Sequence, residues 1–152
     1  MEFSDEDIEQ VRKLSDEILR LFELRDGMEA YIESAARRFA PNTAAIAGPA
    51  LALRLMVLAG GLDKLAKMPS STIQMLGAEK ALFRHLKGQG RAPKHGILFS
   101  HELVQKAPHD SKGKVARLVA AKIAIAARVD FFSKEDRGAQ MRAELEKQVA
   151  GA

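Results

Sequence analysis

Cysteine and tryptophan are missing from the 152 residues of this chain, and tyrosine occurs only once. Without cysteine there is no disulfide framework and no thiolate metal site, a composition typical of intracellular proteins. The scarcity of aromatic residues beside abundant alanine and leucine favours helices over sheets. The length suffices for one domain with a buried core and an appended helix, so we expect an all-α protein.

A long hydrophobic run is missing as well. The most apolar segment, residues 43–58, contains Arg54 and is shorter than the roughly 20 residues that span a bilayer. No segment has the layout of a signal peptide. We therefore expect residues 43–58 to lie in a buried helix, and we expect no membrane partner.

Catalytic motifs are also absent from the sequence. It contains no HExxH, no phosphate loop ending in Gly-Lys-Ser/Thr, no nucleophile elbow and no facial-triad spacing. Three of the four histidines, His95, His101 and His109, fall within fifteen residues, but unpaired surface or loop histidines are much commoner than metal ligands. We therefore predict no catalytic residue, no metal site and no cofactor.

Acidic residues become scarce after the first quarter of the chain, although the net charge is only +4. Residues 1–36 hold eleven acids and four bases, whereas residues 37–152 hold nine acids and twenty bases. Between Lys80 and Arg128, eleven bases stand against only Glu102 and Asp110. Charge kept for solubility usually mixes signs, so this cluster indicates a phosphate-binding surface more than a merely solvated face.

The first segment, Ser4 to Phe39, has the pattern of one long helix. Ser4 and Asp7 have the spacing of a capping box. Apolar residues then recur at intervals of three and four, with one polar exception at Arg25: Val11, Leu14, Ile18, Leu21, Met28, Ile32, Ala35 and Phe39. Such a seam is typical of a coiled coil, and a helix of roughly 50 Å is too long to bury it on a small domain. We expect residues 5–39 to pair with another helix or to self-associate.

The limits of the next elements are predicted from residues that break or cap helices. Pro41 should end the first helix, and Asn42 should cap a core helix that Pro49 kinks or splits before Gly60-Gly61 ends it. The remaining elements are one or two helical turns over 62–67, an irregular extended piece over 97–99, a short turn capped by Ser100, a large helix over 112–132 and a polar, fraying terminal helix over 135–149. The large helix is expected to turn inward Val115, Leu118, Val119, Ile123, Ile125, Ala126 and Val129, and to turn outward Lys112, Lys114, Arg117, Lys122 and Arg128.

The stretch from Met68 to Gly96 carries the main functional signal. It opens with Pro69 and a Ser-Ser-Thr cluster, which is typical of a helix start. Residues 78–87 then predict a helix with two faces: an apolar stripe of Leu82, Phe83 and Leu86, and a basic face of Lys80, Arg84 and Lys87. The Gly-rich loop that follows adds Arg91, Lys94 and His95.

The start of this helix is a second candidate contact. Exposed backbone amides at Gly77 and Ala78, together with the positive end of the helix dipole, would suit an anion. A phosphate of a nucleic-acid backbone is the ligand that we expect there.

The sequence LGAEKALFRHLK followed by PKHGILF closely resembles the signature of the Nop domain. This domain occurs in archaeal and eukaryotic core proteins of box C/D RNA-guided methylation particles and in a related splicing factor. The resemblance continues through APNTAAIAG, AGGLDKLAKMPSSTIQ and KGKVARLVAAKIAIAARVDFFS, so it covers roughly residues 5–134.

The resemblance implies a long coiled-coil helix followed by a compact helical Nop domain. Residues 1–40 would be the second arm of an antiparallel coiled coil, residues 41–134 the Nop domain, and residues 135–152 a C-terminal helix that belongs to it or flanks it. The family's first arm and its amino-terminal, fibrillarin-binding domain are missing here, so fibrillarin would be a partner only through that domain. The archaeal-like spellings imply the cytoplasm of an archaeal cell. The family's segments around Arg128 and Asp130 are mainly fold-forming, so we expect these two residues to be structural ion-pair members in preference to ligands.

The resemblance further implies an RNA-binding scaffold without chemistry of its own. It would recognise a composite surface made by a kink-turn guide RNA and the ribosomal-protein homologue bound to that kink-turn. The expected RNA-binding residues are Gly77, Ala78, Lys80, Arg84, Lys87, Arg91, Lys94 and His95. The expected partner-protein residues are Ser71, Gln74, Met75 and Glu79. His95 would stack on or hydrogen-bond to a base, or simply cap its loop.

Two alternatives stay open at this point. The chain could be a coiled-coil oligomerisation scaffold whose basic surface is incidental, although a scaffold has no reason to gather cations around a Gly-rich loop. It could also belong to the splicing-factor branch of the same superfamily, from which AEKALFRHLK and PKHG differ.

Overall fold

The computed structural model describes residues 4–151, and this part of the chain is helical without any strand. The all-α prediction is therefore confirmed. The chain forms two compact units, residues 1–34 and 35–152. Among the described helices none alone is long and apolar enough to cross a bilayer, and the one pair that passes that test together is bent by 113°.

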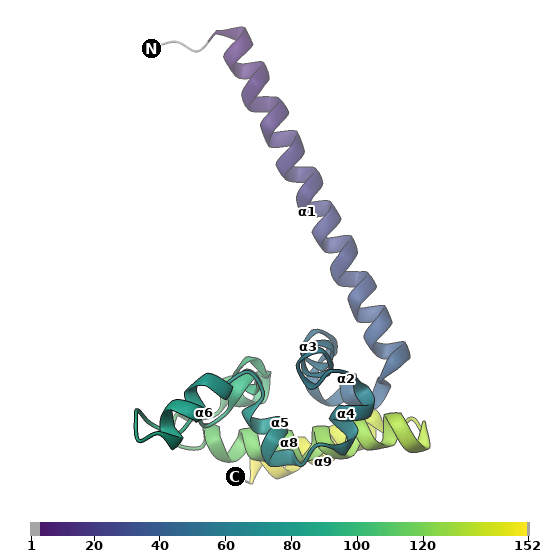
Figure 1. Ribbon diagram of the computed structural model, residues 1–152. Helices are drawn as coiled ribbons and strands as arrows, with labels where there is room; N and C mark the ends of the chain where they lie inside the picture. The colour runs from purple at the N-terminus through teal and green to yellow at the C-terminus, as the bar shows by residue number, and fades with distance from the viewer. Residues whose placement is uncertain (1–3, 152) are drawn as a thin grey trace. The chain divides into compact units, whose positions relative to one another are not determined.

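The first unit is the greater part of α1 (Asp5–Phe39), a continuous helix (Figure 1). The predicted capping box is present, because the Asp7 amide donates to Ser4 Oγ over 3.2 Å and the Ser4 amide donates to Asp7 Oδ2 over 3.0 Å. The seam side chains Leu14 and Leu21 are each 64% exposed. The long helix predicted from the heptad pattern is thus confirmed, with its apolar seam open to solvent.

The second unit is built around α8 (Lys112–Arg128), which packs against α2, α4, α5 and α9. Its buried face is rich in small residues such as Ala116, Ala120 and Ala124, which let these helices approach closely. The other elements are α2 (Pro41–Ala47), α3 (Pro49–Ala59), α4 (Leu62–Lys67), α5 (Ser70–Met75), α6 (Glu79–Leu86), the 3-10 helix η1 (Gly96–Ser100), α7 (Glu102–Lys106), the π-helical turn η2 (Val129–Ser133) and α9 (Gly138–Ala150).

The break between α2 and α3 confirms the effect predicted for Pro49. Gly48 takes a left-handed φ of 81°, and Pro49 is the first residue of α3, where its missing amide hydrogen is harmless. Gly60 ends α3 in the left-handed conformation, with the Gly61 amide donating to the Met56 carbonyl over 2.8 Å. The predicted single helix over 43–59 is therefore two helices.

The start of α2 differs from the prediction that Asn42 caps it. Asn42 lies inside the first turn, and the carboxylate of Asp130 supplies the cap from η2. Asp130 accepts from the amides of Asn42 and Thr43 over 3.0 and 2.8 Å, and from both of their side chains over 2.7 Å. A cap from 88 residues away leaves no local pattern in the sequence.

Arg128 and Asp130 do have structural roles, but not as ion-pair members. Arg128 Nε donates to the Ala66 carbonyl over 3.1 Å, which ties α8 to the end of α4. Among residues 4–151 neither side chain pairs with an opposite charge. Arg128 donates to a backbone carbonyl, and Asp130 accepts from the amides and side chains of α2.

The segment after the Gly-rich loop also departs from the sequence prediction. Residues 96–100 form a 3-10 helix where an extended piece was expected. Ser100 donates its hydroxyl to the Ile97 carbonyl, whereas His101 Nδ1 accepts from the Leu103 amide over 3.2 Å and so caps α7. His101 is 2% exposed, and its Nε2 donates to the Ile46 carbonyl over 2.8 Å.

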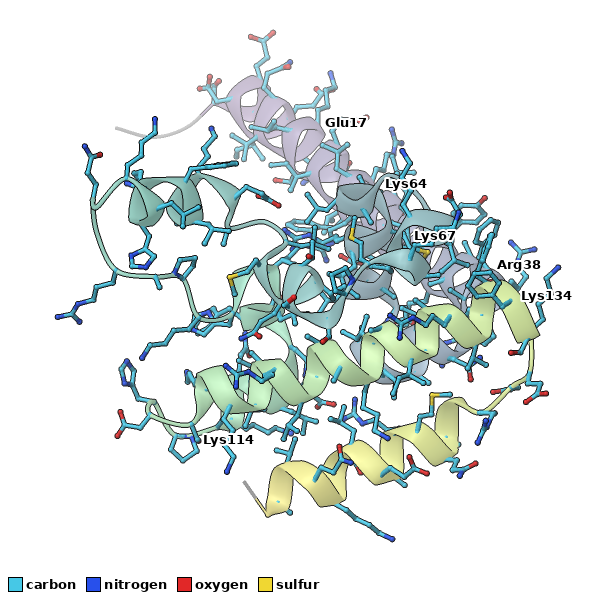
Figure 2. The ribbon with its side chains drawn as sticks, turned by 60° about the horizontal axis from the view of Figure 1, so that its bottom comes forward. Glu17, Arg38, Lys64, Lys67, Lys114 and Lys134 are labelled. Atoms are coloured by element: carbon cyan, nitrogen blue, oxygen red, sulfur yellow. The ribbon has the colours of Figure 1, made fainter. Side chains whose placement is uncertain are left out.

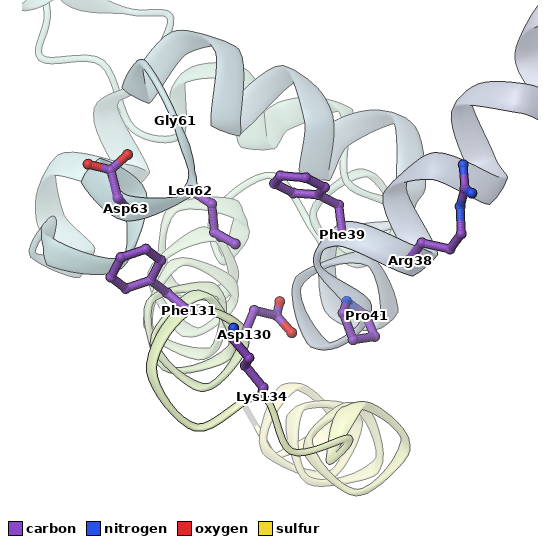
Figure 3. Close-up of a pocket in the computed structure, with 9 residues that line it drawn as sticks. All are labelled: Arg38, Phe39, Pro41, Gly61, Leu62, Asp63, Asp130, Phe131 and Lys134. Atoms are coloured by element: carbon purple, nitrogen blue, oxygen red, sulfur yellow. The ribbon is translucent and has the colours of Figure 1, made fainter.

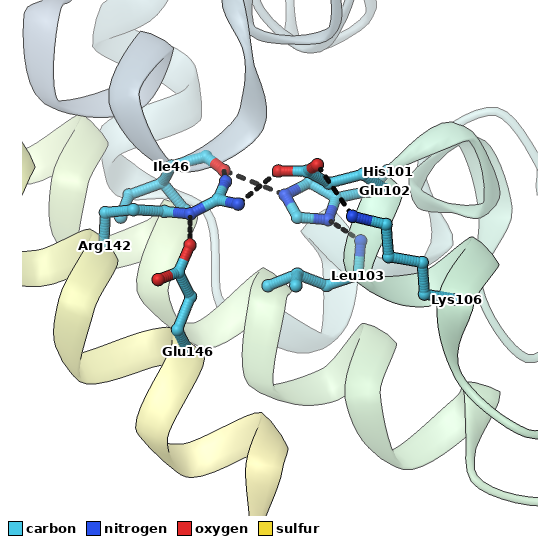
Figure 4. A network of polar contacts seen from close by, with 7 residues as sticks. All are labelled: Ile46, His101, Glu102, Leu103, Lys106, Arg142 and Glu146. Atoms are coloured by element: carbon cyan, nitrogen blue, oxygen red, sulfur yellow. Dashed lines mark hydrogen bonds and ion pairs between the residues drawn. The ribbon is translucent and has the colours of Figure 1, made fainter.

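The terminal helix α9 is part of the core and is not a polar, fraying end. Leu145 is fully buried, and Arg142 contacts Glu102, donates to Glu146 over 2.6 Å and donates to the Ile46 carbonyl over 3.2 Å (Figure 4). This network joins α2, α7 and α9. In α8, Lys122 is half-buried against Glu144 and Ile125 is 45% exposed, so both residues lie on the opposite side from the one predicted.

Candidate nucleic-acid interface

Five cations gather on α6 and the loop that follows it: Lys80, Arg84, Lys87, Arg91 and Lys94. All five side chains are exposed. Within residues 4–151 none of them makes an ion pair or a hydrogen bond to a carboxylate. Some cations outside this cluster are paired, as in the 2.7 Å contact of Lys122 with Glu144. Unpaired charge of one sign on adjacent elements is suited to a polyanion.

The loop itself is held in shape by backbone contacts to α6. Gly88 and Gly90 both take left-handed φ values, 77° and 88°. His85 Nδ1 donates to the Gly90 carbonyl over 3.1 Å, and the Gln89 amide donates to the Arg84 carbonyl over 2.9 Å. His85 therefore shapes the loop.

The far end of the loop is pinned to α5. Gln74 Nε2 donates to the Lys94 carbonyl over 2.6 Å, and the Ile97 amide donates to the Leu76 carbonyl over 2.8 Å. Gly96 has a φ of 47°, and a Cβ atom there would lie 2.8 Å from the Gln74 carbonyl oxygen and closer still to that of Leu76. Only glycine fits this approach, so the pinning fixes where Lys94 and His95 are presented.

The start of α6 is less open than the sequence suggested. The Gly77 amide donates to Glu79 Oε1 over 2.8 Å, and the Ala78 amide donates to the Met75 carbonyl over 3.0 Å. The helix begins at Glu79. The exposed amides expected at Gly77 and Ala78 are thus already donated within the chain, and an anion at Gly77 would have to displace the Glu79 carboxylate.

His95 lies in a small cluster with Phe99 and Lys112. The His95 and Phe99 rings are 4.9 Å apart, and Lys112 Nζ is 5.0 Å from the centre of the Phe99 ring. Burial, together with the charges of Lys112, Lys94 and His109, holds the pKa of His95 below its ordinary value. The imidazole is therefore neutral near pH 7 and is suited to stacking rather than to pairing with a phosphate charge.

The apolar stripe predicted on α6 is only partly buried within this chain. Leu82 is half-buried, whereas Phe83 and Leu86 are 63% and 70% exposed. The helix therefore presents an apolar edge as well as its cations. An exposed aromatic ring beside unpaired cations is a common feature of nucleic-acid surfaces.

Three of the four predicted partner-protein residues share one shallow groove between α5 and α6. Ser71, Met75 and Glu79 line it together with Leu82, and its volume is about 260 Å³. Gln74 is not among its lining residues, because its side chain turns to the loop and donates to Lys94. The candidate protein contact and the candidate RNA contact therefore share α6.

Phe99, His109 and Lys112 are contributions to this surface that the sequence did not single out. Lys112 was expected to point outward from a helix, and Phe99 was assigned to an extended piece. What brings them to His95 is the 3-10 turn η1 beside the start of α8. The only local signal in the sequence for this cluster was the position of Phe99 four residues after His95.

Metal binding finds no support in the part of the chain that the structure describes. No group of three or more His, Asp or Glu side chains there could hold an ion. His85 and His101 are each engaged with backbone carbonyls.

A family model described as "Nop: snoRNA binding domain, fibrillarin" matches residues 1–151. The chain belongs to the Nop family. Among its relatives, a NOP5 family protein of Methanocaldococcus jannaschii is 51% identical over 130 residues, which cover 86% of this chain and 31% of that protein. Nucleolar protein 58 of Scheffersomyces stipitis is 42% identical over 149 residues, covering 95% of this chain and 29% of that protein.

A solved structure supports the same family. The Nop chain resembles a chain of a fibrillarin/Nop5p complex with a TM-score of 0.73 and 30% identity, over 99% of this chain and 56% of that chain. The Nop-domain resemblance found in the sequence is thereby confirmed. The chain spans about a third of the length of these curated relatives.

Proposed function

We propose that this Nop-family chain is the RNA-binding scaffold of a box C/D RNA-guided 2′-O-methylation particle. It recognises a composite surface made by a kink-turn RNA and the kink-turn protein bound to it, and it performs no chemistry. The observation that supports this proposal best is the gathering of Lys80, Arg84, Lys87, Arg91 and Lys94, exposed and without carboxylate partners, on α6 and its pinned loop.

The RNA contact is electrostatic along α6 and more specific at the loop. The five cations neutralise backbone phosphates, while the neutral imidazole of His95, backed by Phe99, lies on an unstacked base. Because Gln74 holds the Lys94 carbonyl, the loop meets the RNA without a large loss of conformational freedom.

The protein contact uses the groove between α5 and α6. Ser71, Met75 and Glu79 supply hydroxyl, thioether and carboxylate groups within one shallow surface. Because this groove and the cationic face share α6, a single ligand surface composed of RNA and protein can cover both. Each half alone is small, so binding to either component alone is weak.

The domain organisation follows the same proposal. Residues 1–40 form one arm of a coiled coil, residues 41–134 the ribonucleoprotein-binding Nop domain, and residues 135–152 its C-terminal helix. The exposed seam of α1 from Val11 to Ile32 pairs with a second helix, either in another copy or in a longer relative. Fibrillarin, which would supply the catalysis, is reached only through a domain outside this sequence, and the particle belongs to the cytoplasm of an archaeal cell.

Calorimetric titration tests the composite surface. The chain is titrated with a box C/D kink-turn RNA alone, with the kink-turn protein alone, and with their complex. We expect tight binding to the complex and binding to each component that is at least about a hundredfold weaker, a coupling of roughly 3 kcal/mol. Equal affinity for naked RNA and for the complex would contradict the composite surface.

A matched pair of variants places the surface on the chain. Arg84→Gln combined with Arg91→Gln should weaken binding to the complex, whereas Arg12→Gln combined with Arg37→Gln, which removes two exposed arginines of α1, should not. If the α1 variant weakens binding and the other does not, the basic surface of α6 is incidental. That result would favour the coiled-coil scaffold, which the exposed seam of α1 also supports.

A further inference from the structure

A second surface lies at the other end of α8, where α1 ends and η2 begins. It is a hollow of about 860 Å³ whose walls include Phe39, Leu62 and Phe131. Phe39 and Phe131 stand on opposite sides with Leu62 between them (Figure 3). Phe39 is 71% exposed and Phe131 37% exposed, so two aromatic rings from distant parts of the chain face open space.

Cations surround this hollow. Arg38 and Lys134 line it, and Lys67 Nζ lies 5.9 Å from the centre of the Phe131 ring. Figure 2 shows Lys64 on the same side of the second unit as these three, whereas Lys114 lies at the other end of α8. Among the described residues no carboxylate pairs with Arg38, Lys64 or Lys134.

The two acids of the hollow do not cancel these charges. Asp130 is 6% exposed and accepts four hydrogen bonds from Asn42 and Thr43, so its charge is absorbed by the start of α2. Asp63 is the other lining acid. Arg38, Lys67 and Lys134 outnumber this one remaining carboxylate, so the rim is positive on balance.

The position of Lys134 is itself built into the fold. Its φ of 57° is the only left-handed value of a non-glycine residue in residues 4–151. The Lys134 amide donates to the Val129 carbonyl over 2.7 Å, which closes η2 and holds the residue at the edge of the hollow. Glycine or asparagine would adopt this conformation more readily than lysine, and side-chain packing does not explain the lysine, because its side chain is exposed.

We propose that this hollow binds one nucleotide of a single-stranded RNA segment. The base lies against the rings of Phe39 and Phe131, and the adjoining phosphates are neutralised by Arg38 and Lys134. Stacking on aromatic rings beside cations is how proteins hold unpaired nucleotides without reading their sequence. An acidic peptide would use the cations but would leave two exposed phenyl rings without planar partners.

The proposal rests on the proposed RNA-binding function and extends it. The loop after α6 reaches the start of α8 at Lys112, beside Phe99, and the hollow adjoins the end of α8. The 17 residues of α8 separate these two ends by about 26 Å. One RNA that is held at the kink-turn end can therefore reach the hollow with a single-stranded flank. The hollow would then hold a flanking segment and not the kink-turn.

A single tryptophan reports directly on the hollow, because the chain has none of its own. The Phe39→Trp variant places an indole where a 71% exposed ring already stands, so folding is not at risk. It is titrated with an oligoadenylate of about eight nucleotides, within the range of single-strand sites. We expect the tryptophan emission to be quenched on binding, and we expect Lys134→Gln added to the Phe39→Trp variant to weaken binding about fivefold. Phe39→Ala carries no tryptophan, so its expected loss of about fivefold is measured by calorimetric titration against the unmodified chain.

Controls separate this proposal from the proposed function. Arg37→Gln removes an exposed arginine beside Arg38 that does not line the hollow, and it should leave the titration unchanged. If the chain binds the complex of kink-turn RNA and protein but the tryptophan emission stays unchanged with oligoadenylate, the hollow is no RNA site and the proposed function stands. If the chain binds neither the complex nor the oligoadenylate, both the proposed function and the proposal for the hollow are overturned.

A protein occupant would give a different result. Phe39 is also the last position of the coiled-coil seam, so a second helix could cover it. In that case the emission would follow the concentration of the chain itself and not that of the RNA. Sedimentation of the same samples identifies that outcome, which would overturn the proposal.

Discussion

Replacing Asp130 by alanine should unfold the second unit far more easily than any surface substitution. The carboxylate accepts four hydrogen bonds of 2.7 to 3.0 Å, from the amides and side chains of Asn42 and Thr43. Alanine leaves the amides of Asn42 and Thr43 and the Thr43 hydroxyl buried without this acceptor, whereas Asn42 Nδ2 keeps its 2.7 Å hydrogen bond to the Glu135 carbonyl. The free energy of unfolding therefore loses the hydrogen bonds to Asp130, and three donors remain buried without a partner.

The magnitude follows from the number and kind of these bonds. A hydrogen bond to a charged group contributes about 1.5–3 kcal/mol, but four bonds to one carboxylate do not add independently. Each buried donor left without an acceptor costs about 1–3 kcal/mol, so the loss of this one carboxylate costs about 3–5 kcal/mol in total. We expect the Asp130→Ala variant to lose that amount, which for a domain of about 120 residues lowers the melting temperature by about 10–20 °C.

Urea unfolding followed by far-ultraviolet circular dichroism measures the loss. Asp110→Ala is the matched control, because Asp110 is fully exposed and should change the free energy of unfolding by less than about 0.5 kcal/mol. Thr43→Val removes one donor, and its cost should largely vanish in the Asp130→Ala background. A loss below about 1 kcal/mol for Asp130→Ala would refute the view that this carboxylate caps α2.

Three further substitutions test the other structural claims. Gly96→Ala should lower the free energy of unfolding by more than about 1 kcal/mol and speed hydrogen exchange of the Ile97 amide. The new Cβ of Gly90→Ala meets no atom within 4 Å, so this variant should lose only the left-handed penalty of about 1 kcal/mol. Equal losses for the two variants would mean that the loop is not pinned. Burial lowers the pKa of His101, so the free energy of unfolding should have its full value above the ordinary imidazole pKa of about 6.5. It should decrease at lower pH, because the unfolded state binds the proton more readily. His101→Gln should flatten this pH dependence, and a urea midpoint that stays the same from pH 7.5 to 5.5 would contradict it. Leu145→Ala should cost about 2–5 kcal/mol by urea unfolding, and a cost below about 1 kcal/mol would place α9 outside the core.

Elements with strong local signals were predictable from the sequence. The heptad spacing predicts α1, the Ser4–Asp7 pair predicts its cap, and Pro49 with Gly60 predicts the limits of α3. In each case the deciding physics acts within a few residues. A proline without an amide hydrogen or a glycine with positive φ needs no tertiary context.

Features that depend on distant contacts were not predictable. The cap of α2 comes from Asp130, 88 residues along the chain, so Asn42 looked like the cap in its place. The terminal helix α9 looked polar, because only Met141 and Leu145 among its large side chains are fully buried. Ile125 was assigned to the core by its chemistry alone, yet it is 45% exposed.

The candidate site shows the same division. Its cations were identified from their spacing on one helix face, and α6 presents them as expected. The amides of Gly77 and Ala78 could not be judged from spacing, because their acceptors, Glu79 and Met75, depend on the turn between α5 and α6. Lys112 joins the site only because η1 and the start of α8 meet.

The central claim is that the cations of α6 neutralise RNA phosphates. Its most direct test is the salt dependence of binding to the complex of kink-turn RNA and kink-turn protein. The triple variant Lys80→Gln, Arg84→Gln, Lys87→Gln should make the slope of log K against log salt shallower by about 2 to 2.7, since each phosphate contact contributes about 0.7 to 0.9. A control triple of Arg12, Arg37 and Lys147 to Gln should keep the slope of the unmodified chain. An unchanged slope in the α6 variant would show that these cations do not meet the RNA.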